Sequence, residues 1–181
     1  MENFIKVYDD VLAPDICKQI IEKFEINKDQ QEETILKGHR SFKEIQLNKF
    51  DDWKPIVDGL YTTFKSRIGT YAKEVGITPT QWPKQYGFEA IRMKRYEPND
   101  IDEFKEHVDV GDYDSARRFL VFFLYLDSNK EGATSFSNFD IAIKPKAGRL
   151  LMFPPTWTYL HTGHKPIEQN KYIIGSYLHY V

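Results

Sequence analysis

The chain has 181 residues, of which 41% are hydrophobic and 15% aromatic, so it can bury the core of one globular domain. Its formal net charge of -2 at pH 7 gives no basic excess of the kind typical of nucleic-acid-binding proteins. No apolar run approaches the roughly 20 residues of a membrane span, and a single cysteine excludes an intramolecular disulfide framework.

The compartment is predicted from the same features. The lone cysteine, Cys17, fits a reducing environment, and the N-terminal residues lack the apolar core of a signal peptide. We therefore expect a soluble protein of the cytoplasm that binds neither membrane nor nucleic acid.

The first part of the chain predicts two helices. Residues 4–12 begin as a short strand and enter a turn, after which Pro14 and Asp15 open a helix. Its apolar residues recur at helical spacing: Ile16, Ile20, Ile21 and Phe24. A longer helix is predicted over 52–75 and ends at Gly76, with an apolar set of Ile56, Leu60, Phe64, Ile68, Tyr71 and Val75.

The segment between these helices is polar at first. Residues 27–38 are predicted to form a loop closed by Gly38, and the alternation over residues 40–47 predicts a strand.

From residue 82 onward the sequence predicts β-structure. Short β-type segments alternate with turn signals: 86–96, 119–126, 141–144, 150–153 and 172–180. Helices followed by many short strands predict one α+β domain over residues 1–181, with a helical part over about 1–80. The part over about 82–181 is expected to form a jelly-roll, cupin-like core, a double-stranded β-helix with the N-terminal helices packed on one sheet.

A candidate metal site lies in Glu106-His107-Val108-Asp109. On a strand, His107 and Asp109 point to the same face and can offer an imidazole nitrogen and a carboxylate oxygen to one ion. Two histidines and one carboxylate form the ligand set of non-haem Fe(II) oxygenases. The tripeptide alone occurs by chance in many chains, so its weight depends on the residues around it.

Two histidines compete for the position of third ligand. His161 follows Leu160 and precedes Lys171 by ten residues, whereas His164 precedes Lys171 by seven, and we favour His161 on this spacing. Lys171 opens an apolar strand, and a lysine inside a barrel needs a negative partner, which a dicarboxylic acid cosubstrate would supply. Tyr96 ends an earlier strand and can donate its hydroxyl to the same carboxylate.

The order of these motifs resembles the 2-oxoglutarate- and Fe(II)-dependent oxygenases, specifically the prolyl 4-hydroxylase-like branch. The resemblance covers nearly the whole chain, through Arg40-x-Phe42, Arg95-Tyr96, His107-x-Asp109, Arg118, Tyr125-Leu126, residues 132–136, residues 145–153, His161 and Lys171-Tyr172. The pieces are common individually, but this order and spacing is specific.

The resemblance implies an enzyme with a defined set of cofactors. His107, Asp109 and His161 would bind Fe(II), with O2 and 2-oxoglutarate as cosubstrates and ascorbate as reductant. The implied reaction hydroxylates an unactivated C–H bond and yields succinate and CO2.

The resemblance also assigns the cosubstrate contacts. Lys171 would pair with the far carboxylate of 2-oxoglutarate, assisted by Tyr96 and Ser135. Tyr177 stands where the family usually has a tryptophan near the cosubstrate. Other departures are Ala133 in place of a glycine and Phe104 in place of a tyrosine, and all three border the substrate pocket.

The substrate is predicted from two further positions. Arg118 and His179 fall where plant-type prolyl hydroxylases place residues that face the substrate, which implies a proline-containing peptide or protein. The alternatives are a hydroxylase of another amino acid or small molecule, or a non-catalytic jelly-roll binding module. The intact candidate triad and Lys171 argue against the binding module.

Overall fold

The computed structural model describes residues 2–181. The α-helices of this part are α1 (Pro14–Ile26) and α2 (Lys54–Glu74). It also contains the short 3-10 turns η1 (Glu2–Phe4), η2 (Lys28–Gln30), η3 (Leu47–Lys49), η4 (Asp51–Trp53) and η5 (Ser137–Phe139). The strands are β1 (Lys6–Tyr8), β2 (Glu32–Leu36), β3 (Arg40–Gln46), β4 (Tyr86–Phe88), β5 (Arg92–Tyr96), β6 (Phe104–His107), β7 (Arg118–Tyr125), β8 (Thr134–Phe136), β9 (Ile141–Ile143), β10 (Arg149–Phe153), β11 (His161–Gly163) and β12 (Lys171–Tyr180).

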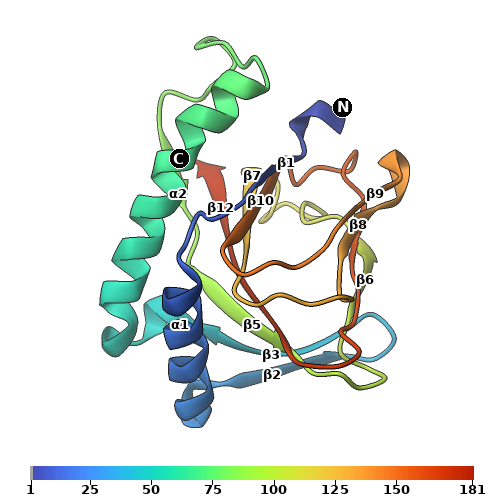
Figure 1. Cartoon of the computed structure of the whole chain (residues 1–181). Coiled ribbons are helices and arrows are strands. Elements are labelled where there is room, and N and C mark those ends of the chain that lie inside the picture. The colour runs from blue at the N-terminus through green and yellow to red at the C-terminus, as the bar shows by residue number, and fades with distance from the viewer. Residues whose placement is uncertain (1) are drawn as a thin grey trace.

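The strands form one curled antiparallel sheet in the order β1-β10-β7-β12-β5-β3-β6-β11-β8-β9, with β2 paired to β3 and β4 to β12. Both α-helices lie on the same side of it, and the curl brings β6, β8 and β9 to the side opposite the helices (Figure 1). This arrangement confirms the predicted α+β fold with a jelly-roll core and N-terminal helices.

One hydrophobic core lies between the helices and the sheet. α1 contributes Cys17, Ile20 and Phe24, and α2 contributes Val57, Leu60, Phe64, Ile68 and Tyr71, in both helices at intervals of three to four residues. Phe64 stacks on Phe122 of β7 with ring centroids 5.0 Å apart, which joins the longer helix to the middle of the sheet.

A second core lies inside the curl of the sheet and includes Val121, Tyr125, Phe136 and Phe153. The long strand β12 serves both cores because successive side chains point to opposite faces. Tyr172 and Ile174 face the helices, whereas Ile173 and Tyr177 face the interior of the curl, as does the cavity-lining Lys171. The cavity described below lies on this interior face.

The prediction of a loop over residues 27–38 is wrong in part. Residues 32–36 form β2, an antiparallel partner of β3, and Gly38 lies in the hairpin turn with φ +76°. β2 is mostly exposed, so the hydrophobic alternation that marks a half-buried strand is absent, and backbone pairing to β3 defines it.

The other predicted elements overlap those observed, but residues 86–96 form two strands, β4 and β5, and the short strands β6, β8 and β11 were not predicted. α1 begins at Pro14, and Gly76 follows α2 with φ +72°, as predicted for a C-terminal glycine. Ile16 is an exception, because it is 41% exposed and packs in neither core. Within residues 2–181, neither helix combines the length and apolar character needed to cross a membrane.

Candidate active site

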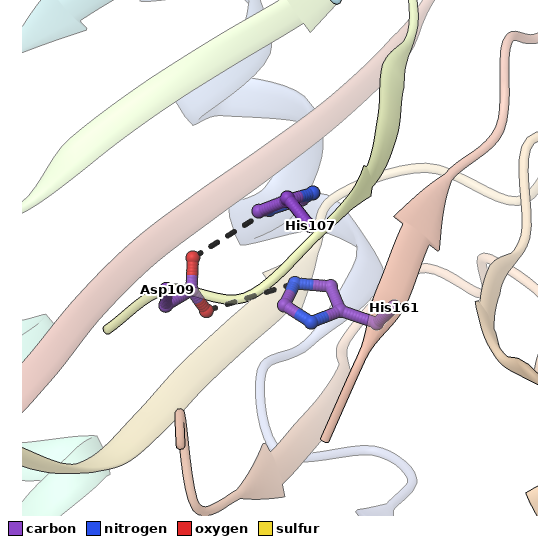
Figure 2. A group of neighbouring side chains, drawn as sticks. All are labelled: His107, Asp109 and His161. Carbon is purple, nitrogen blue, oxygen red and sulfur yellow. Dashed lines mark ion pairs between the residues drawn. The ribbon is translucent and has the colours of Figure 1, made fainter. Parts of the chain in front are cut away.

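Strand pairing brings the two candidate histidine ligands together. β6 and β11 pair in a register that sets His107 directly opposite His161, with ring centroids 4.3 Å apart. Asp109 follows the end of β6, and its Oδ1 and Oδ2 lie 3.6 Å from Nε2 of His107 and His161 respectively (Figure 2). Three residues from two separate parts of the chain thus face one point.

The hydrogen bonds of the histidines leave the correct atoms free for a metal. Nδ1 of His107 lies 2.7 Å from the Lys105 carbonyl, and Nδ1 of His161 lies 2.9 Å from the Tyr159 carbonyl. A carbonyl only accepts, so each Nδ1 carries the proton and each Nε2 keeps a lone pair.

The free atoms of these residues are buried and unpartnered. Nε2 of His107, Nε2 of His161 and Oδ2 of Asp109 are inaccessible to solvent and make no hydrogen bond within the described residues. The three side chains offer ligand atoms that all lie within 4.8 Å of one another. Orphaned buried polar atoms are costly, and a divalent ion between them would satisfy all three, so the donor set fits Fe(II).

The electrostatics of the cluster favour the ligand forms. Burial alone would raise the pKa of Asp109, but His161, His107 and a hydrogen bond from Tyr177 outweigh it and hold this pKa at about 2. Burial lowers the pKa of His161, although Asp109 opposes the shift. A carboxylate beside a neutral imidazole is the protonation state that coordinates a metal.

Neighbouring side chains fix the orientation of the cluster. The Phe104 ring stacks on His107 at 3.5 Å between centroids, and the Tyr177 hydroxyl donates to Asp109 Oδ1 at 2.9 Å. Arg118 donates to the Asp109 carbonyl at 2.9 Å and pairs with Glu89 at 2.8 Å. Arg118, a predicted substrate contact, lines the cavity. Its guanidinium donates hydrogen bonds to the Asp109 carbonyl and to the Glu89 carboxylate.

The cluster opens into a cavity of about 580 Å³ that Lys171 also lines. β12 and β5 pair so that Lys171 lies opposite Tyr96, with Nζ 4.5 Å from the tyrosine ring centroid. Lys171 is fully buried, and Nζ donates to the carbonyls of Gly132, at 3.1 Å, and of His164. Burial lowers the pKa of Lys171 to about 7, against the opposing charge of Asp127.

Ser135, the predicted cosubstrate contact, is not among the residues that line the cavity. Thr134 lines the cavity, whereas Ser135 does not and instead hydrogen-bonds to Nε2 of His164 at 2.7 Å. The same contact places the His164 imidazole away from the cluster, so the structure brings His161, not His164, to His107 and Asp109.

Like Ser135, the predicted substrate contact His179 lies outside the cavity. It lies near the end of β12, where its register partners are Gly87 and Arg118, and its Nδ1 is 3.2 Å from the Tyr180 carbonyl. It is absent from the lining of the cavity, so the structure offers no basis for its predicted contact with substrate.

Several lining residues were missed by sequence reasoning. They are charged or aromatic side chains on one wall of the cavity: Arg40, Phe42, Glu44, Glu89, Arg92 and Lys94. A signal for some of them was present, because counting back by two from Tyr96 along the strand gives Lys94 and Arg92.

Comparisons with known proteins agree with this site. Residues 91–179 match the family described as the 2OG-Fe(II) oxygenase superfamily, and they contain the three clustered residues and Lys171. A search of curated proteins gave no match.

Solved structures share the fold at low sequence identity. The viral collagen prolyl hydroxylase of Paramecium Bursaria Chlorella virus-1, in its 2OG complex, superposes with a TM-score of 0.71 and 18% identity over 98% of this chain and 96% of that chain. A prolyl hydroxylase of Trichoplax adhaerens gives 0.78 and 16%, over 98% and 84%. A Pseudomonas putida prolyl-4-hydroxylase gives 0.68 and 12%, over 99% and 94%.

These likenesses to solved structures are of fold, whereas the family match covers most of the residues that line the cavity, including His107, Asp109, His161 and Lys171. Through residues 91–179 the chain therefore belongs to the 2OG-Fe(II) oxygenase superfamily and is a 2-oxoglutarate-dependent dioxygenase that uses Fe(II), 2-oxoglutarate and O2.

Proposed function

We propose that this dioxygenase hydroxylates a prolyl residue in a peptide or protein, with succinate and CO2 as coproducts. The observation that carries the proposal is the shared cavity. Three unpartnered metal-ligand atoms, on His107, Asp109 and His161, and the buried ammonium of Lys171 line the same space. A metal and a dicarboxylate bound there would satisfy all of these groups at once.

His107, Asp109 and His161 would hold the iron. When bound, Fe(II) supplies the oxidation chemistry that couples decarboxylation of 2-oxoglutarate to hydroxylation of the substrate. The chain keeps both imidazoles in the coordinating tautomer through the carbonyls of Lys105 and Tyr159. We further propose ascorbate as the reductant that keeps the iron ferrous.

Lys171, Tyr96 and Thr134 would bind the far carboxylate of 2-oxoglutarate. The Tyr96 hydroxyl makes no hydrogen bond within residues 2–181 and lines the cavity beside Lys171, so it is free to donate. The Thr134 hydroxyl accepts from Tyr125 at 2.6 Å, which leaves its own proton for a ligand. Burial in this dry pocket strengthens each of these contacts.

The prolyl substrate is supported by the structural relatives. Those reported above are prolyl hydroxylases, and one of them is in complex with a peptide fragment of the hypoxia inducible factor oxygen degradation domain. Hydroxylation of another amino acid is the second candidate, because the wall of the cavity that includes Arg40 and Lys94 is charged.

The test is turnover with Fe(II), 2-oxoglutarate, ascorbate and proline-containing peptides, followed by mass spectrometry and a succinate assay. We expect a mass gain of one oxygen atom in a peptide, lost in Asp109→Ala and retained in the exposed control Lys65→Ala. Added Mn(II) should raise the melting temperature of the parent protein but not of Asp109→Ala. Succinate without peptide oxidation would contradict the prolyl substrate alone.

A further inference from the structure

Lys94 is a cation of the cavity wall that lacks an anionic partner. It precedes Tyr96 by two residues on β5, is partly buried and lines the cavity. Its Nζ lies 4.3 Å from the ring centroid of Phe42 and 5.6 Å from that of Phe104. Within residues 2–181 it makes these cation–π contacts but neither a hydrogen bond nor an ion pair.

The carboxylate on the strand beside Lys94 already has a cationic partner. Glu44 is the cross-strand partner of Lys94 on β3 and is 8% exposed. Its Oε1 accepts from Arg92 at 3.3 Å and from Thr34 at 3.3 Å, whereas its Oε2 is buried and makes no hydrogen bond within the described residues. Glu44 thus has one cationic partner, Arg92, and its single charge does not also balance Lys94 and Arg40.

Arg40 is a second cation without an anionic partner. It lies on β3, where it lines the cavity like Phe42 and Glu44, and its guanidinium is 5.5 Å from the Phe104 ring. Its Nε is buried and has no hydrogen-bond partner in the described residues. Both unpaired cations thus flank the ring that stacks on His107.

The charges deeper in the cavity cancel once the cofactors are present. Fe(II) and Lys171 together balance the dianion of 2-oxoglutarate and Asp109, and Arg118 balances Glu89. The carboxylates of Asp112 and Asp114 belong to an exposed rim segment. A positive excess remains on the wall that bears Lys94 and Arg40.

An unpaired buried cation is costly, and such a group is satisfied when a ligand supplies the counter-charge. We infer that Lys94 and Arg40 bind a carboxylate of the substrate. The inference deepens the proposed function and rests on it, because it takes the substrate to enter this cavity. The carboxylate is that of a free amino acid or of an acidic side chain beside the hydroxylated residue in a peptide.

The electrostatic surroundings of Lys94 favour binding of an anion. Burial lowers the pKa of Lys94, while Glu44 and Asp109 oppose the shift and Arg92 and Arg40 reinforce it. A carboxylate bound between Lys94 and Arg40 would favour the charged ammonium and offset the repulsion from the two guanidinium groups.

The test measures binding without turnover, in protein loaded with Mn(II) and 2-oxoglutarate. One arm titrates each free L-amino acid against its amide by calorimetry. The other titrates a blocked Gly-Glu-Pro-Gly peptide against Gly-Gln-Pro-Gly. In at least one arm we expect the carboxylate to bind at least about tenfold tighter than its amide, and that arm identifies the source.

The preference should disappear in Lys94→Met, persist in Lys94→Arg, and persist in the exposed control Lys65→Met, which loses the same charge. The affinity for 2-oxoglutarate should be equal in all four proteins. No carboxylate preference in either arm, or a preference that survives in Lys94→Met, would overturn the inference.

Two outcomes separate this inference from the proposed function. Weaker binding of 2-oxoglutarate in Lys94→Met, without any carboxylate preference, would assign Lys94 to the cosubstrate and leave the dioxygenase site intact. Failure of the parent protein to take up Mn(II) and 2-oxoglutarate would remove both proposals.

Discussion

The Tyr177 hydroxyl donates a hydrogen bond of 2.9 Å to Oδ1 of Asp109, across 68 residues of sequence. Tyr177 lies on β12, six residues after Lys171, so one strand carries both a group that orients a candidate metal ligand and the candidate anchor of the cosubstrate. The bond fixes the rotation of the carboxylate and leaves Oδ2 without a partner beside His161.

Loss of this hydrogen bond should weaken metal binding. In Tyr177→Phe the carboxylate of Asp109 loses its orienting donor, so we expect the Kd for Mn(II) to rise about 10- to 100-fold. Tyr180→Phe, on the same strand but 52% exposed, should bind Mn(II) like the parent protein. Calorimetry provides the measurement, and equal affinity in both variants would show that the bond does not position the ligand.

Binding of 2-oxoglutarate should depend on pH through Lys171. The lysine has a pKa of about 7 in the free protein, and its protonated form is the one that binds a carboxylate. Above that pH a proton must be taken up on binding, so the Kd should rise by about tenfold per pH unit until the pKa of the bound state is reached.

The matched variants are Lys171→Arg and Lys171→Ala. A guanidinium stays protonated, so Lys171→Arg should give a flat profile over the same range. Lys171→Ala should bind 2-oxoglutarate more weakly at every pH. Identical slopes for the parent protein and Lys171→Arg would assign the pH dependence to another group.

Adjacent hydroxyls on β8 should differ in their effect on cosubstrate affinity. Thr134→Val removes a hydroxyl that lines the cavity. Loss of the net contribution of one hydrogen bond to binding predicts a rise in the KM for 2-oxoglutarate of about 2- to 10-fold. Ser135→Ala removes a hydroxyl that contacts His164 and should leave this KM unchanged. The reverse result would restore Ser135 as the cosubstrate contact.

Two glycines should respond in opposite directions to alanine. Gly148 has φ +77°, and a Cβ there would lie 2.1 Å from the Leu12 carbonyl oxygen, so Gly148→Ala should lower the free energy of unfolding by at least about 1–3 kcal/mol. Gly59 lies in α2 with no atom within 4 Å of a Cβ, and Gly59→Ala should raise it by about 0.5–1 kcal/mol. Urea denaturation measures both, and similar effects would contradict the packing at Gly148.

Elements with a strong local pattern were predictable. The spacing of Leu60, Phe64 and Ile68 defines the buried face of α2, because a helix repeats every 3.6 residues whatever it packs against. Pro14 and Gly76 mark helix ends for equally local reasons of backbone geometry. The polar strand β2 was missed because its pairing with β3 depends on a partner strand rather than on its own composition.

Choices between strand faces were less secure. A shift of one residue turns a side chain to the other face, and this separates Ser135, which was predicted from the family resemblance, from Thr134, which lines the cavity. The same alternation, applied backward from Tyr96, would have found Lys94. His179 is an even number of residues after Lys171 on β12, so the alternation of faces alone would place it on the cavity side. It lies beyond Tyr177, the last residue of β12 that lines the cavity, and only the tertiary structure shows where the cavity ends.

The sequence by itself determined which residue types the chain holds, their spacing along each element and the family to which they belong. The tertiary structure decided which of them meet. The register of β6 on β11 sets His107 against His161, and that of β12 on β5 sets Lys171 against Tyr96. Such pairings join segments far apart in the chain, and the packing of the whole sheet, not the local preference of either strand, selects them.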